Sequence, residues 1–364
     1  MPSQTEDRKA EHIRIALAKD VRARETTTGL EDIRFVHQAL PEIDRDQISL
    51  TTKVFDHTFS APLLVGAMTG GTKDARKING FIAEAVEELD LGMGVGSQRA
   101  ALENPRLEST YKVARKKAPN AFLIANVGAP QLVQGYGLKE VKTAVEMIEA
   151  NALAVHLNPL QEAIQPEGEA RYAGVLRKIG EITETLQVPV IVKETGAGVS
   201  AEVARTLEQA AVKNIEVAGA GGTSWAAVEY YRAGNAKNRC RRRLGESFWD
   251  WGIPTAASII EVSQSTNLTI IASGGVRTGI DVAKALAVGA SLSSVSTPIL
   301  RPATQSATEV KKTLSLLIEE LRNTMFLSGA DSVGDLKNTR LVLTGKTAEW
   351  LEMRGFKPEI YARR

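Results

Sequence analysis

The chain has few of the residues that mark secreted or zinc-binding proteins. It contains a single cysteine, Cys240, among 364 residues. One cysteine excludes an internal disulfide framework and a thiolate zinc site. The N-terminal stretch MPSQTEDRKAEHIRIALAKD has no apolar signal core, and no apolar run approaches the ~20 residues of a membrane span. We therefore expect a soluble protein of the reduced cytoplasm, with no membrane partner.

The chain also lacks an excess of charge of either sign. Lys and Arg number 45 and Asp and Glu number 43, which leaves a net charge of +2. This balance argues against a nucleic-acid partner, although a local basic pocket for a small anion remains compatible with it. Apolar residues make up 43% of the chain, which is enough for a large core.

Short apolar, β-branched runs recur along the chain, with amphipathic helical stretches between them. Most runs are continuous rather than alternating, which is typical of strands buried on both faces. Strand and helix alternating eight times predict an α/β fold, a (β/α)8 TIM barrel. Helices are expected at residues 74–89, 138–150, 201–212 and 279–289. The expected strands lie at residues 62–68, 91–97, 122–128, 152–158, 188–194, 214–220, 268–275 and 291–298.

No linker divides the chain, so we expect one domain over residues 1–364, with the barrel at 62–327. An N-terminal segment, 1–61, holds one predicted helix (6–20) and extended pieces. A C-terminal extension, 328–364, is expected to pack on the barrel. The longest connection contains a basic run at 237–243, which we interpret as a solvated loop or the edge of a lid.

Polar residues follow nearly every predicted strand. Catalytic groups of this fold sit at the C-terminal ends of the strands, so such residues indicate a ligand-lined mouth. They are Thr69, Ser97, Gln98, Arg99, Asn126, His156, Asn158, Lys193, Glu194 and Arg277.

Two glycine-rich segments predict a phosphate site. In the stretch IIASGGVRTGIDVAKALAVGA, a strand runs into Gly274 and Gly275, and a helix begins near Gly279. Glycines let the backbone approach a phosphate, and the helix N-terminus holds the anion. The alternative is a tight strand-to-helix turn without a ligand. The segment GAGGT, one strand earlier, and the usual phosphate position of this fold favour the ligand.

Lys193 ends an apolar strand, where it is either a Schiff-base lysine, a cation facing a developing anion, or a snorkelling side chain. The glycine segments together with Asn126 fit a large phosphorylated ring cofactor, beside which Lys193 would favour an anionic form.

Glu162 and Gln161 are expected on a loop past the fourth strand, near His156. One carboxylate can hold Mg²⁺ only if substrate phosphates and water complete the shell. Three further histidines have no evident pairing and are expected to be structural or exposed: His12, His37 and His57.

Taken together, these stretches resemble type II isopentenyl diphosphate isomerase, the flavin-dependent family. The resemblance spans the N-terminal helix and nearly the whole barrel. It implies a reversible 1,3-allylic proton shift between isopentenyl and dimethylallyl diphosphate in isoprenoid biosynthesis. It also implies FMN, Mg²⁺, NADPH as flavin reductant, and a homotetramer or homo-octamer. The motifs are DRKAEHI, AMTGGT, GVGSQRA, NVGAPQL, HLNPLQEAIQPEGE, VPVIVKETGAG, GAGGTSWAAVE, DWGIPTAAS and SGGVRTGIDVAKALAVGA.

The resemblance also assigns roles to residues at matching positions. Glu162 would bind Mg²⁺, and the catalytic set would be Gln161, His156, Lys193, Glu229 and Trp225. The substrate would meet Arg8, Lys9, Ser97, Gln98, Arg99, His156, Asn158 and Gln161. FMN would contact Ala67, Met68, Thr69, Ser97, Asn126, Lys193, Thr223, Gly275, Val276, Arg277, Val295 and Ser296.

The expected chemistry agrees with what the sequence lacks. Protonating an unactivated alkene needs a strongly tuned acid, and no paired-carboxylate or Cys–Glu set is present. A reduced flavin would supply the proton donor and acceptor, with Gln161 and Glu229 assisting and Lys193 stabilising the anionic flavin. One position departs from the family, because Ala218 stands where a serine is usual, which removes one expected hydroxyl contact to flavin.

The nearest alternative is an FMN-dependent 2-hydroxy-acid oxidase, which has the same barrel and a similar GGVR segment. Its chemistry needs a histidine base after the sixth strand, where this chain reads GAGGTSW. A dehydrogenase with a cysteine nucleophile is disfavoured because Cys240 lies in NRCRRR. A catalytically silent flavin-binding regulator would have lost the substrate set, which is present here.

Overall fold

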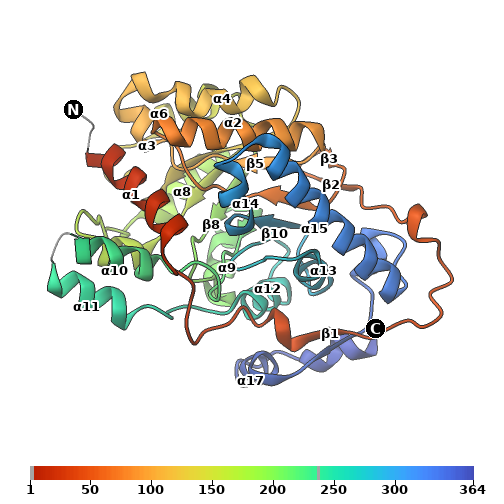
Figure 1. Cartoon of the computed structure of the whole chain (residues 1–364). Helices are drawn as coiled ribbons and strands as arrows, with labels where there is room; N and C mark the ends of the chain where they lie inside the picture. Colours follow the sequence, from red (N-terminus) through yellow and green to blue (C-terminus); the bar gives the residue numbers. More distant parts are fainter. Residues whose placement is uncertain (1–3, 236–237) are drawn as a thin grey trace.

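A computed structural model describes residues 4–235 and 238–364. Eight parallel strands form a closed barrel in sequence order, which confirms the predicted (β/α)8 fold (Figure 1). The barrel closes where the last strand pairs with the first, with Ser293 opposite Leu63 and Val295 opposite Val65. The strands are β4 (Leu63–Val65), β5 (Gly92–Gly94), β6 (Phe122–Gly128), β7 (Ala152–His156), β8 (Val190–Lys193), β9 (Asn214–Glu216), β10 (Thr269–Ala272) and β11 (Leu292–Val295).

Several strands are shorter than the sequence predicts, mainly at their C-terminal ends. The predicted strand 62–68 stops at Val65, and the predicted strand 91–97 stops at Gly94. The residues that follow leave the ladder and turn over the mouth of the barrel. Apolar composition continues across these ends, so periodicity alone does not mark where pairing stops.

Helices surround the barrel, and the four helices expected at 74–89, 138–150, 201–212 and 279–289 are confirmed. Capping explains some of their starts: the Thr72 side chain accepts from the N–H of Ala75, and Ser200 does the same for Val203. The outer helices are α2 (Lys73–Glu88), α3 (Arg99–Glu103), α4 (Ser109–Lys117), α5 (Ala129–Leu132), α6 (Leu138–Met147), α7 (Pro159–Ile164), α8 (Val175–Thr185), α9 (Ala201–Gln209), α10 (Trp225–Asn235), α11 (Arg239–Ser247), α12 (Thr255–Ser263), α13 (Gly279–Ala287), α14 (Thr297–Ala303) and α15 (Ala307–Ser328).

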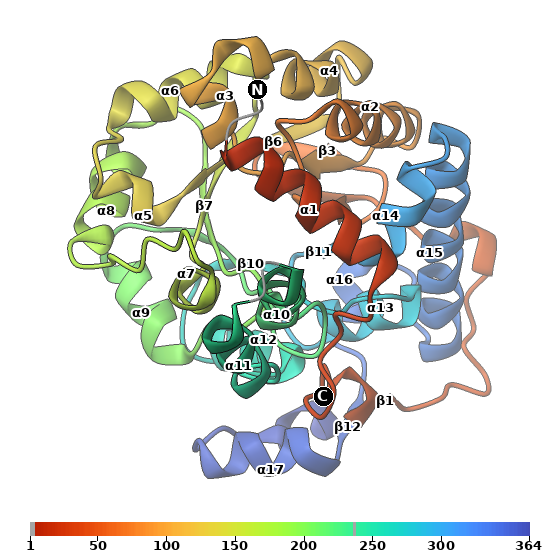
Figure 2. The ribbon, with the colours of Figure 1, turned by 60° about the vertical axis from the view of Figure 1, so that its left-hand side comes forward.

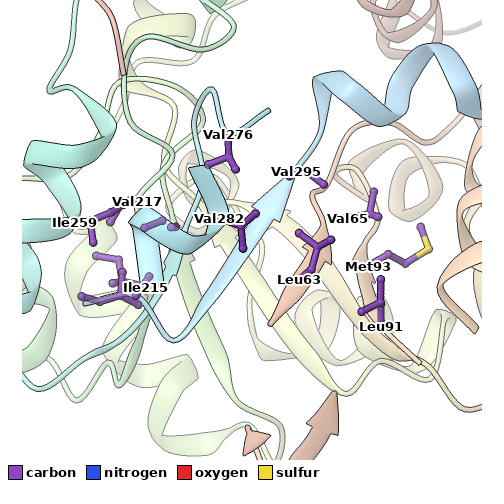
Figure 3. Packing of buried hydrophobic residues seen from close by; sticks show 14 of the residues in the cluster. Leu63, Val65, Leu91, Met93, Ile215, Val217, Ile259, Val276, Val282 and Val295 are labelled. Carbon is purple, nitrogen blue, oxygen red and sulfur yellow. The ribbon is translucent and has the colours of Figure 1, made fainter. Parts of the chain in front are cut away.

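The main core lies between the strands and the outer helices. Alternate residues of β4 belong to two separate hydrophobic clusters. Leu63 and Val65 pack outward against the helices, whereas Leu64 points into the barrel. Figure 3 shows the outward layer, in which Met93 and Val295 continue the same packing. Both faces of each strand are therefore buried, which explains the continuous apolar runs.

An antiparallel hairpin fills the N-terminal end of the barrel interior. It consists of β2 (Thr52–Val54) and β3 (His57–Phe59). Phe59 is fully buried, and its ring centroid lies 5.4 Å from that of Phe122 at the start of β6. The Phe55 ring stacks on Phe122 at 5.5 Å. The hairpin thus closes this end with aromatic side chains and leaves the opposite end for ligands.

The two chain termini contribute to the same body. Strand β1 (Ile33–Phe35) pairs antiparallel with β12 (Leu341–Leu343), which joins the N- and C-terminal segments. The C-terminal helices are α16 (Val333–Leu336) and α17 (Gly345–Met353). Helix α1 (Gln4–Ala18) contacts α10 and lies over the mouth of the barrel (Figure 2).

No helix within residues 4–235 and 238–364 combines the length and apolar composition needed to cross a membrane.

The interpretation of the basic run as a loop is wrong for the residues that the structure describes. Arg239–Ser247 form α11, and the side chain of Asn238 caps it by accepting from the N–H of Arg241 at 3.1 Å. The Arg241 guanidinium donates to the carbonyl of Ala163 at the end of α7, at 2.9 Å. The cap at Asn238 is a start signal that the charge run obscured. Lys237 lies outside the described residues.

Candidate active site

A cavity of about 290 Å³ opens at the C-terminal ends of the barrel strands and is covered on one side by α1. It is lined by residues from strand ends that are far apart in sequence, together with five residues of α1: Arg8, Lys9, His12, Ile13 and Ala16. The catalytic, substrate, cofactor and metal residues that the resemblance implies line this cavity, with three exceptions: Gln98, Glu229 and Val295. Glu194, also expected at the mouth, does not line it, and its Oε2 accepts from the N–H groups of Thr195, Gly196 and Ala197.

The glycine segments form a close-packed cradle at one end of the cavity. Gly275 has φ of +72°, and a Cβ there would lie 2.4 Å from Thr28 Cγ2. A Cβ on Gly222 would lie 2.4 Å from the Gly275 nitrogen. Both positions therefore require glycine. Within the described chain, the N–H groups of Gly275 and Val276 have no hydrogen-bond acceptor, so they are available to an anion.

The start of α13 is fixed by a capping box beside this cradle. Asp281 Oδ2 accepts from the N–H groups of Arg277 and Thr278, at 3.0 Å each. Arg277 also lines the cavity. Unused backbone N–H groups, a helix N-terminus and a guanidinium at one place fit the phosphate end of FMN.

His156 and Asn126 form a fixed pair on neighbouring strands. The Asn126 amide nitrogen donates to the Val95 carbonyl at 3.1 Å, so its oxygen faces His156 Nδ1 at 2.8 Å. His156 Nδ1 therefore carries the proton. Burial, followed by the charge of Lys193, lowers the pKa of His156 to about 3. The imidazole is neutral and leaves Nε2 as an acceptor.

Lys193 lies at the end of β8 and is buried in the cavity wall. Its ammonium donates to the carbonyl of Glu194 at 2.7 Å and lies 3.6 Å from Glu216 Oε1. Glu216 also lines the cavity, although no pattern in the sequence selected it. An ammonium at this position in the cavity wall can stabilise an anionic ring beside it.

Gln161 and Glu162 lie on α7, a short helix rather than the predicted loop. Pro159 opens this helix, where its missing N–H costs nothing. Asn158 Nδ2 donates to Glu162 Oε1 at 2.9 Å and to Gln161 Oε1 at 3.2 Å. The three side chains expected around the substrate therefore form one hydrogen-bonded group.

Mg²⁺ is compatible with this group only with help from a ligand. Among residues 4–235 and 238–364, no three His, Cys, Asp or Glu side chains gather to hold a metal ion. Glu162 is a single buried carboxylate, and one of its oxygens accepts from the N–H of Glu169 at 2.6 Å. Gln165 also lines the cavity, and its buried Oε1 has no partner among the described residues. One carboxylate and one unpaired amide oxygen fit a cation whose other ligands are phosphate and water.

Glu229 lies just behind the cavity wall and reaches it through two neighbours. Its Oε1 lies 3.5 Å from Gln161 Nε2 and 3.0 Å from His12 Nε2, and its Oε2 accepts from Arg232 at 2.6 Å. Burial acts to raise the pKa of Glu229, but His12 and Arg232 outweigh it, so the pKa is lowered. The carboxylate is therefore ionised.

His12 is the main functional candidate that the sequence interpretation missed. It was expected to be structural or exposed, yet it lines the cavity, pairs with Glu229 and packs edge-on against Trp225 at 5.2 Å. The spacing carried a usable signal, because Arg8 and His12 are four residues apart and share one helix face.

One end of the cavity is basic, with Arg8, Lys9 and Arg99 along its wall. Burial, followed by the neighbouring charge of Arg8, lowers the pKa of Lys9 to about 7. Arg99 forms a two-point ion pair with Glu169, at 2.9 and 3.2 Å, and a further ion pair with Glu103. These carboxylates keep the pKa of Arg99 above its usual value, although burial opposes them.

Two residues expected in contact with ligands are placed elsewhere. Gln98 is fully buried; its amide donates to the Ala144 carbonyl at 2.8 Å and accepts from the Asn126 N–H at 2.9 Å. Its side chain supports the strand that carries Asn126 and does not reach the cavity. Val295 points into the core, while Ser296 beside it lines the cavity. The sequence places residues at a strand end, but the pleat decides which side they face.

Comparison with known proteins agrees with this geometry. Residues 141–343 match the family of FMN-dependent dehydrogenases. An isopentenyl-diphosphate delta-isomerase of Methanothermobacter thermautotrophicus is 48% identical, over 98% of this chain and 99% of that protein. The isopentenyl-diphosphate delta-isomerase of Pyrococcus furiosus is 51% identical, over 95% of this chain and 89% of that protein. The chain belongs to the isopentenyl-diphosphate delta-isomerase family.

Among solved structures, the isomerase fold is similar to that of FMN-dependent oxidases. A flavocytochrome b2 variant matches with a TM-score of 0.66 and 17% identity, over 94% of this chain and 87% of that chain. A lactate oxidase of Pediococcus acidilactici matches with a TM-score of 0.64 and 17% identity, over 94% of this chain and 93% of that chain. At this identity the oxidases share the barrel, whereas the isomerases share the sequence over nearly its full length.

Proposed function

We propose that the chain isomerises isopentenyl diphosphate to dimethylallyl diphosphate reversibly, using bound FMN in its reduced form. The observation that carries this proposal is that the residues proposed to bind flavin and those proposed to bind the diphosphate line one cavity. A flavoprotein regulator would not need the second set. When bound and reduced, FMN supplies a ring nitrogen that can give or accept the proton.

The chain's own residues would bind and orient the two ligands. The free N–H groups at Gly275 and Val276, with Arg277, would hold the FMN phosphate. Lys193 would keep negative charge on the ring favourable. At the opposite end, Lys9 and Arg99 would bind the substrate diphosphate. The assignment of each contact is part of the proposal.

Glu162 would bind Mg²⁺ through one carboxylate oxygen, with the diphosphate and water completing the shell. Asn158 fixes that carboxylate by a hydrogen bond of 2.9 Å. Gln161 would hold the alkene end of the substrate, and the ionised Glu229 would accept or return a proton through His12, whose Nε2 lies 3.0 Å from it. Helix α1, which carries His12, would exclude water from this part of the cavity.

The proposal also includes NADPH as the reductant, a homo-oligomeric assembly and a cytoplasmic location. These follow from the family resemblance and from the reduced character of a chain with one cysteine. Trp225 would form an apolar wall for the substrate's carbon chain, because its ring lines the cavity and its Nε1 is tied to the Thr195 carbonyl at 3.0 Å.

A proton-exchange assay tests the proposal. Isopentenyl diphosphate is incubated in deuterated water with the protein and oxidised or reduced FMN, with and without Mg²⁺. We expect deuterated dimethylallyl diphosphate only with reduced flavin and Mg²⁺. Isomerisation that proceeds undiminished without flavin would contradict the proposal. Oxidation of a 2-hydroxy acid such as lactate or mandelate, with no isomerisation, would instead support the oxidase alternative.

A further inference from the structure

Tyr111 lies beneath the basic end of the cavity, although no sequence motif selected it. It belongs to α4 and is fully buried. Its hydroxyl donates to the Ser97 carbonyl at 2.7 Å, and its oxygen accepts from the Lys9 ammonium at 2.7 Å. Lys9 donates to the same Ser97 carbonyl. These three groups join α1 to the loop after β5, 88 residues further along the chain, and to α4, 102 residues further along.

The Tyr111 ring is held in place by the loop that follows β4. A Cβ on Gly70 would lie 2.0 Å from Tyr111 Cε1, and one on Gly71 would lie 3.3 Å from the hydroxyl. The backbone therefore covers the ring closely and leaves it no other position. Burial also raises the pKa of Tyr111. The phenol stays neutral and keeps both a donor and an acceptor.

The contact restricts where Lys9 can point. An ammonium has three N–H donors. In the described part of the chain, Tyr111 and Ser97 take two of them, which leaves one for an anion in the cavity that Lys9 lines. A free lysine side chain loses roughly 1.5–2 kcal/mol of conformational entropy when it is ordered. A lysine already held by Tyr111 has lost much of that freedom before the ligand arrives.

The chemistry of the partner also matters. A carboxylate in place of the phenol would hold Lys9 as well, but it would neutralise the ammonium and repel a diphosphate. A phenol oxygen holds the ammonium without adding negative charge. Without the phenol, Lys9 would keep only the contact with the Ser97 carbonyl, which lies on a loop and holds the ammonium less firmly.

We propose that Tyr111 is a positioning residue whose hydroxyl fixes Lys9 of the N-terminal helix at the cavity and thereby sets the affinity for the substrate diphosphate. The role rests on the proposed function, which supplies the diphosphate. Tyr111 itself does not line the cavity and reaches it only through Lys9 and Ser97.

Tyr111→Phe tests the role in the full-length, FMN-loaded protein, with inorganic pyrophosphate as the probe. We expect pyrophosphate to bind about tenfold more weakly, as for the loss of one charge-assisted hydrogen bond. KM for isopentenyl diphosphate should rise by a similar factor, while kcat and FMN affinity stay within about twofold. Tyr136→Phe is the matched control, because the Tyr136 hydroxyl is buried without a partner among the described residues.

A double-mutant cycle separates positioning from a general structural effect. In the Lys9→Met background, Tyr111→Phe should cause no further loss of pyrophosphate affinity, because Tyr111 acts through Lys9. Equal losses in both backgrounds, or unchanged binding in the single variant, would overturn the role of Tyr111. Wild-type protein that bound neither FMN nor pyrophosphate would overturn the proposed function as well, so the two failures are distinguishable.

Discussion

The two ends of the barrel use the same eight strands for opposite purposes. At the N-terminal end, Phe55, Phe59 and Phe122 fill the interior with stacked and edge-on rings. At the C-terminal end, the same strands end in His156, Lys193 and other polar groups around a cavity of about 290 Å³. The first end gains stability from apolar burial. The second keeps buried charges and unpaired N–H groups, which favour ligand binding at a cost in stability.

If this division is correct, changes at the N-terminal end should alter folding and leave the site intact. Phe59→Ala removes a fully buried ring from the aromatic cluster. We expect a loss of about 3–5 kcal/mol in the free energy of unfolding. Below the lowered melting temperature, KM and FMN affinity should stay within about twofold of wild type. Chemical denaturation and steady-state kinetics on the same preparation measure both, and a large change in KM would break the comparison.

The corresponding change at the mouth should have the reverse pattern. Glu162→Gln keeps the shape and the contact with Asn158 but removes the charge that would face Mg²⁺. We expect kcat/KM to fall about 10²–10³-fold, as for loss of a preorganised charge contact. The Mg²⁺ concentration for half-maximal activity should rise. The melting temperature should fall by less than for Phe59→Ala, because the new amide can still accept one of the two hydrogen bonds from Asn158 and Glu169.

The control is Glu184→Gln, the same substitution at an exposed position on α8. It should alter neither the Mg²⁺ dependence nor the rate. An unchanged Mg²⁺ dependence in Glu162→Gln would remove Glu162 from the metal site.

Most of this contrast could be predicted from the sequence. Continuous apolar runs predicted the strands, because strand pattern is local in the sequence. Polar residues after these runs predicted the mouth, because the right-handed βα connections of this fold bring all the strand ends to one face. The aromatic plug and the contact between His12 and Glu229 could not be predicted. These depend on pairs far apart in sequence, 217 residues in the case of His12 and Glu229. Gln98 shows a second limit of sequence-based prediction. It lies after a strand end as expected, but its side chain points away from the cavity.

Protonation of Lys9 should make the mouth sensitive to pH in a way that the apolar end is not. Burial and Arg8 lower the pKa of Lys9 to about 7, and Glu103 opposes them. Below that pH the ammonium is ready for an anion. Above it, binding must first take up a proton, so pyrophosphate affinity should fall by up to about tenfold per pH unit.

Lys9→Arg isolates this effect, because a guanidinium stays charged throughout the range. Titrations of pyrophosphate at pH 6 to 9 should diverge above the pKa of Lys9, with wild type losing more affinity than the variant. The ionisation of pyrophosphate itself is common to both proteins and cancels in the ratio. Parallel profiles would show that Lys9 is charged in the free protein over the whole range.

The smallest effect is expected at Ala218, where the family resemblance implies a serine. Ala218 lines the cavity, and its backbone has φ of +38°, which is costly for a side chain. Its N–H already donates to Ser273 Oγ at 3.2 Å. Ala218→Ser would add one hydroxyl at a wall that Ser273 and Ser294 already make polar. We expect FMN to bind at most about threefold more tightly, since a neutral hydrogen bond contributes about 0.5–1.5 kcal/mol and part of that is lost to ordering the new side chain.

Fluorescence titration of FMN resolves such a change, and Ala220→Ser, at a buried alanine outside this cavity, is the control. A gain of tenfold or more would show that the flavin ring makes a closer contact here than the neighbouring serines supply. Weaker binding would show that the backbone at this position tolerates only the smallest side chain.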